Sequence, residues 1–139
     1  MNFSVALFMI AAALIVAGIM LAVIFFTKRP SRLNVDQYRT AWLQIENSLS
    51  RDQPVTYHMA ILNADKLLDK ALKELNVSGD TMGERMKSAR NRFSNNNAVW
   101  AAHKLRNQIA HEQNVAINYT NARRALASFK RALKDVGAI

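Results

Sequence analysis

Hydrophobic residues fill one unbroken stretch near the start of the chain and recur periodically everywhere else. From Val5 to Phe26 no side chain is charged or strongly polar. A helix of this length measures roughly 33 Å, enough to cross a hydrocarbon core about 30 Å thick. The stretch therefore predicts a transmembrane helix, and we assign residues 1–27 to a membrane anchor.

Two other interpretations fit a long apolar stretch, namely the buried helix of a soluble protein and a cleaved signal peptide. Apolarity on every face suits lipid better than a protein core. No Lys or Arg precedes the stretch, it is long for a signal peptide, and basic residues stand where a cleavage site would lie. These features favour a retained anchor.

Basic residues follow the anchor immediately and indicate its orientation. Lys28, Arg29, Arg32 and Arg39 come after it, whereas only the α-amino group precedes it. The positive-inside rule then places the N-terminus outside the cell membrane and the rest of the chain in the cytoplasm. We expect residues 28–33 to form a juxtamembrane linker in which Lys28, Arg29 and Arg32 contact anionic headgroups.

Beyond the linker, apolar residues recur at steps of three and four, the pattern of amphipathic helices. Thr81 and Glu84 have the spacing of a capping box, and Val77-Ser78-Gly79 is typical of a helix end. The core positions of the last helix are Ala122, Ala125, Leu126, Phe129, Ala132, Leu133 and Val136. We predict helices over 35–49, 56–76, 81–93 and 98–111, and a fifth from about 120 to just before Gly137.

Short loops between such helices predict an antiparallel bundle of four to five helices over residues 34–139. The fold class is therefore all-α, with an N-terminal transmembrane helix followed by this bundle. The scarcity of Gly (4) and Pro (2) among 139 residues agrees with this class.

Composition then narrows the chemistry. The chain has no cysteine, which excludes disulfides, Cys-ligated zinc and a thiol nucleophile. Three histidines without an HExxH pattern argue against a zinc site, and no glycine-rich phosphate loop is present. We expect neither metal nor cofactor. The net charge of +9 favours phosphate-bearing partners, either RNA or lipid headgroups.

The helix predicted over 98–111 has two unlike sides on a helical wheel. One side is apolar and we expect it to face the core: Ala98, Ala101, Ala102, Leu105 and Ile109. A merely solvated opposite side would carry mostly Glu and Lys. This one instead carries Trp100, His103, Arg106, Asn107 and His111, so we expect it to face outward and contact a partner.

Within this helix, the segment from Leu105 to His111 (LRNQIAH) resembles the signature of HEPN domains. These small helical bundles carry an Arg followed, after four to six residues, by a His, and the residue after the Arg is often Asn, as Asn107 is here. The resemblance covers residues 34–139 and extends to small bacterial membrane proteins with one N-terminal span and a stretch like WAAHKLRN. It implies metal-independent cleavage of RNA by two copies whose motifs line one cleft.

The residue types present suit that chemistry. RNA carries its own nucleophile, the 2′-OH, so a cleaving site needs a proton acceptor and a cation for the phosphate. We predict His111 as the proton acceptor, Arg106 as the cation and Asn107 as an orienting group, with Trp100 and His103 contributing to binding.

A homodimer would complete such a site. Arg106 and His111 lie about 140° apart around the helix, so one chain does not direct both at one atom. A two-fold pair would combine Arg106 of one copy with His111 of the other. Small residues four apart in the anchor also favour pairing: Ala13 with Ala17, and Gly18 with Ala22.

Plainer roles remain open for the same residues. His111 suits a helix C-terminus through the helix dipole. Arg106 would equally form a structural ion pair with Asp36, Asp65, Asp69 or Glu84. The expected function is binding of RNA or a protein partner at the membrane, with RNA cleavage as a narrower variant. The alternative is a non-catalytic structural adaptor that binds another membrane or envelope protein.

Overall fold

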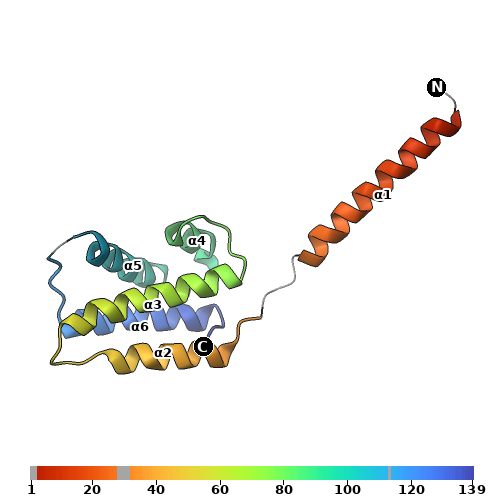
Figure 1. Ribbon diagram of the computed structural model, residues 1–139. Helices are drawn as coiled ribbons and strands as arrows, with labels where there is room; N and C mark the ends of the chain where they lie inside the picture. The colour runs from red at the N-terminus through yellow and green to blue at the C-terminus, as the bar shows by residue number, and fades with distance from the viewer. Residues whose placement is uncertain (1–2, 28–31, 113) are drawn as a thin grey trace. The chain divides into compact units, whose positions relative to one another are not determined.

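The computed structural model describes residues 3–27, 32–112 and 114–139, and over those residues it contains helices and connecting loops but no strand (Figure 1). The all-α prediction, with an apolar N-terminal helix ahead of a helical bundle, is confirmed. The chain forms two compact units, the N-terminal helix and the bundle. Of the predicted lipid-contacting residues, Arg32 is exposed, and Lys28 and Arg29 lie outside the described residues.

The N-terminal unit is one helix, α1 (Phe3–Thr27). Its segment Ser4–Ile24 has a mean hydropathy of 2.9, and none of that segment is buried. By length and composition α1 is a candidate membrane-spanning helix.

The bundle contains the five predicted helices with small shifts at their ends. The third is the exception, because α4 stops at Ser88 and the chain continues as a short 3₁₀ helix. The elements are α2 (Val35–Ser48), α3 (Val55–Glu74), α4 (Met82–Ser88), η1 (Arg90–Arg92), α5 (Asn96–His111) and α6 (Tyr119–Asp135).

Side-chain caps begin four of these helices. Asn34, Asn95 and Asn118 each accept a hydrogen bond from the backbone N–H three residues later, at the starts of α2, α5 and α6. At α4 the predicted capping box is confirmed, since the Glu84 N–H donates to Thr81 Oγ1 (3.2 Å) and the Thr81 N–H donates to Glu84 Oε2 (3.3 Å). Such caps satisfy backbone donors that a helix leaves unpaired at its start.

The end of α3 differs in detail from its prediction. Asn76 (φ 54°) takes the left-handed conformation after the helix, and the Val77 N–H closes the turn on the Leu72 carbonyl. Gly79 (φ 142°) has another purpose, because a Cβ there would lie 2.6 Å from the Arg85 backbone nitrogen. This glycine therefore lets the loop pass close to α4.

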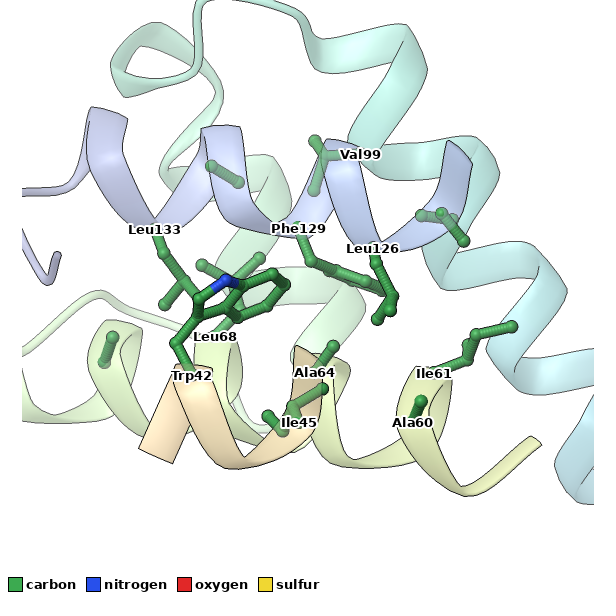
Figure 2. Close-up of a cluster of buried hydrophobic side chains, with 14 of the residues drawn as sticks. Trp42, Ile45, Ala60, Ile61, Ala64, Leu68, Val99, Leu126, Phe129 and Leu133 are labelled. Carbon is green, nitrogen blue, oxygen red and sulfur yellow. The ribbon is translucent and has the colours of Figure 1, made fainter. Parts of the chain in front are cut away.

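The core of the bundle is built around α3, which contacts α2, α4, α5 and α6. Figure 2 shows α3 side chains beside Trp42 of α2 and Phe129 of α6, and Val99 of α5 belongs to the same buried cluster. Burying one such side chain contributes about 1.5–3 kcal/mol. The core positions predicted on the last helix are buried, apart from Val136, which is half-buried: Ala122, Ala125, Leu126, Phe129, Ala132 and Leu133.

Candidate functional site

Helix α5 turns to the core a face that only partly matches the one its apolar residues indicate: Ala102 is buried as predicted, and Ala98, Leu105 and Ile109 are half-buried. Its buried residues are Val99, Ala102 and His103, whereas Ala101, expected inside, is exposed. α5 contacts both α3 and α6, so its buried face lies between those two helices. The expectation that His103 faces outward is therefore wrong.

The partner of His103 inside the bundle is Asp65 on α3. Only 2% of Asp65 and 6% of His103 are exposed, and Asp65 Oδ1 lies 2.7 Å from His103 Nδ1. The second carboxylate oxygen, Oδ2, lies 3.1 Å from Arg106 Nε, an ion pair whose N–H is not aligned for a hydrogen bond. A buried carboxylate needs such partners, because removing a charge from water is costly.

Asn107 closes these contacts into a ring. Its Nδ2 lies 3.3 Å from His103 Nε2, and its Oδ1 accepts a hydrogen bond of 3.0 Å from Arg106 Nη1. Asp65, His103, Asn107 and Arg106 thus form one closed polar network, which we call the Asp65 ring. It joins one residue of α3 to three residues on adjacent turns of α5.

Donor and acceptor chemistry orders the Asp65 ring. Arg106 only donates, so Asn107 Oδ1 accepts from it and the Asn107 amide N–H donates to His103 Nε2. His103 then carries its proton on Nδ1 and donates it to Asp65. With Nδ1 facing Asp65, Nε2 is the ring nitrogen left to accept from the Asn107 amide.

An open pocket of about 550 Å³ lies beside the Asp65 ring. Trp100 is half-buried with its ring edge-on to His103, at 5.8 Å between centroids, and Gly83 of α4 lies across from His103 Nε2. The most accessible charged group of the ring is Arg106, whose side chain is 28% exposed. Other residues that line the pocket include Lys66, Asp69, Asp80, Thr81 and Lys104.

A second ion cluster holds α4 against α3 at the edge of this pocket. Arg85 is buried, and its Nη2 lies 2.7 Å from Asp69 Oδ1 while its Nη1 donates to the Gly79 carbonyl. Lys73 Nζ lies 2.8 Å from Asp69 Oδ2. Burial alone would raise the pKa of Asp69, but its hydrogen bonds to Lys73 and Arg85 hold that pKa below its usual value. These residues therefore shape the pocket wall.

The remaining motif residue, His111, stands apart from the Asp65 ring. It is exposed at the last position of α5, and it does not line the pocket that Arg106 lines. One chain therefore brings Arg106, Asn107 and His103 together but leaves His111 separate. Among the described residues, no group of three His, Asp or Glu side chains is placed to hold a metal ion.

Asp65 lies outside the motif, but it is one of the four acids that the sequence offered as ion-pair partners of Arg106, and that ion pair is present. Asp65 follows Ile61 by four positions and precedes Leu68 by three, so it lies on the apolar side of α3. A carboxylate on the apolar side of a helix indicates a buried partner elsewhere in the chain. The motif residues on α5 do not identify that partner.

Comparison with protein families, curated proteins and solved structures finds no match to this chain. The resemblance to HEPN domains consequently rests on the segment from Leu105 to His111 and on the helical frame that holds it. What the geometry adds is the Asp65 ring and the pocket beside it.

Proposed function

We propose that this protein is a membrane-anchored, HEPN-like domain that binds RNA through the Arg106 edge of α5. The observation that carries the proposal is the state of Arg106. Its guanidinium is held by Asp65 and Asn107, yet the side chain as a whole stays 28% exposed in an open pocket that Lys66 and Lys104 also line. A guanidinium held in this way presents its remaining N–H groups to phosphate oxygens.

The anchor supports a location at the membrane surface. α1 is long and apolar enough to span the cell membrane. The basic residues after it favour an orientation with the N-terminus outside and the bundle on the cytoplasmic side. RNA would then be bound close to the inner face of the membrane. Lys28, Arg29 and Arg32 would contact the headgroups.

Cleavage is the narrower form of this proposal and needs a second copy. Within one chain Arg106 and His111 are separate, so a homodimer would have to place His111 of one copy beside Arg106 of the other. His111 would take the proton of the RNA 2′-OH as the 2′-oxygen bonds to the adjacent phosphorus. The bond from phosphorus to the 5′-oxygen would break, leaving a 2′,3′-cyclic phosphate, and the 5′-oxygen would take a proton from water. Arg106 would stabilise the charge on the phosphate without a metal.

The test uses the full chain in nanodiscs of zwitterionic lipid, with labelled single-stranded RNA and EDTA present. We expect retention that weakens with salt, and a loss of about tenfold in affinity for Arg106→Ala. The matched control Arg92→Ala removes one exposed positive charge away from the pocket and should change affinity much less. RNA cleavage that His111→Ala abolishes would support the nuclease.

One observation favours the alternative, a structural adaptor for another membrane or envelope protein. Asp65 engages both His103 and Arg106 within the chain, as a purely structural network would. The same experiment separates the two functions. Absence of RNA retention by the wild-type protein at low salt would overturn the RNA proposal and leave the adaptor.

A further inference from the structure

The two oxygens of Asp65 have separate partners. Oδ1 accepts a hydrogen bond from His103 Nδ1 (2.7 Å), and Oδ2 lies 3.1 Å from Arg106 Nε. Asp65 is 2% exposed and contacts Arg106 from the α3 side, and it lines the pocket together with the acids Asp69 and Asp80. Asp65 therefore acts on Arg106 from a buried position in the pocket wall.

Arg106 is held at two points and no more within the Asp65 ring. Nε faces Asp65, and Nη1 donates to Asn107 Oδ1 at 3.0 Å. The two N–H groups of Nη2 are not used in the ring. A long, flexible side chain held in this way loses little further freedom when a phosphate binds.

We propose that Asp65 is a positioning residue, which orients the Arg106 guanidinium so that its Nη2 edge meets a phosphate of the bound RNA. This inference rests on the proposed function. It names the residue that fixes the orientation in which Arg106 contacts the phosphate. Asp65 touches no RNA itself. It acts through Arg106 directly and, by way of His103, through Asn107.

The positioning role and plain electrostatics predict opposite changes in RNA affinity when the Asp65 carboxylate is removed. A negative charge 3.1 Å from Arg106 weakens the attraction of the site for phosphate, so its removal should strengthen binding if charge alone matters. If Asp65 positions Arg106, its removal should weaken binding although the protein becomes more positive. The sign of the change therefore decides between the two.

Asp65→Asn is the sharpest substitution, because it changes one atom and keeps the shape. The amide oxygen still accepts a hydrogen bond from His103 Nδ1, whereas the amide nitrogen now faces Arg106 Nε, and two donors repel. The matched control is Asp80→Asn. Asp80 lines the same pocket, is exposed, and gives the same change in net charge.

The experiment measures RNA affinity against salt for the full chain in zwitterionic nanodiscs. We expect Asp80→Asn to bind as tightly as wild type or a few-fold more tightly. Asp65→Asn should bind about tenfold more weakly, with the slope of log affinity against log salt reduced by about 1. Adding Arg106→Ala to Asp65→Asn should cause no further loss, because both changes remove the same contact.

Each other outcome overturns a defined part of the argument. Binding by Asp65→Asn that equals or exceeds that of Asp80→Asn overturns the positioning role alone, and so does an additive effect of the two substitutions. If Asp65→Asn fails to fold, Asn107→Ala removes the other contact that holds Arg106, the hydrogen bond from Nη1. Unchanged RNA affinity of Asn107→Ala then overturns the positioning of Arg106 by the Asp65 ring. Absence of RNA binding by wild type overturns the proposed function, and the inference falls with it.

Discussion

A single buried carboxylate determines what α5 presents at its surface. Asp65 draws His103 inside and leaves Arg106 half-exposed, although both residues stand on the side of α5 that its sequence marks as polar. The helical wheel failed here because the opposite side is mostly alanine, and exposing an alanine costs little apolar area. The pairing of buried Asp65 with His103 and Arg106 outweighed the small cost of exposing Ala101.

At the same scale, the neighbouring Asp69 makes the stability of the bundle decrease at low pH. Its pKa is lowered in the folded state by Lys73 and Arg85, so the unfolded chain binds the proton more tightly. The stabilisation is complete above the unfolded value, near pH 4, and is lost as pH falls through the lower folded value. We expect the free energy of unfolding to decrease below about pH 4, and less steeply in Asp69→Asn.

Tryptophan fluorescence can follow this transition in the full chain in detergent. Both tryptophans, Trp42 and Trp100, lie in the bundle and neither lies in α1. Asp36→Asn, at an exposed acid in the first turn of α2, is the matched control. An acid transition of equal steepness in wild type and Asp69→Asn would contradict the assignment.

At the scale of elements, caps and apolar spacing determine where each helix lies. α4 has only seven residues, so its capping box and the ion cluster at Arg85 account for much of what holds it in place. The helix also forms a wall of the pocket, through residues 82, 83 and 85. A weakened start of α4 should therefore loosen the pocket as well as the helix.

Thr81→Ala tests this dependence. It removes the oxygen that accepts the Glu84 N–H, and we expect the free energy of unfolding to fall by about 1 kcal/mol. Thr81→Ser, which keeps the hydroxyl, should recover most of the loss. Denaturant unfolding followed by tryptophan fluorescence measures both variants, and equal stability of all three proteins would show that the box contributes nothing.

At the scale of the whole molecule, the proposed function depends on which side of the membrane holds the bundle. The chain has no cysteine, so a single introduced cysteine is a unique label. We expect Asn2→Cys to react with a membrane-impermeant maleimide in sealed right-side-out vesicles. Lys87→Cys, at an exposed position of α4, should react only after the vesicles are opened. The reverse pattern would place the bundle outside and exclude binding of cytoplasmic RNA.

The all-α class, the apolar N-terminal helix, the capping box at Thr81 and the core side of α6 followed from the sequence alone. Each depends on residues within a few positions of one another, and helix periodicity and caps act over that range. The shortening of α4 and the left-handed Asn76 were local details that similar signals left undecided.

Only the tertiary structure decided which residues of α5 are buried and which form a site. Asp65 and His103 are 38 positions apart, and their contact exists because α5 packs on α3. Periodicity within one helix carries no information about a charge on another. The motif therefore identified Arg106 and Asn107 as a candidate site, and helix spacing alone separated Arg106 from His111. The packing of two helices supplied the carboxylate that contacts Arg106 and His103.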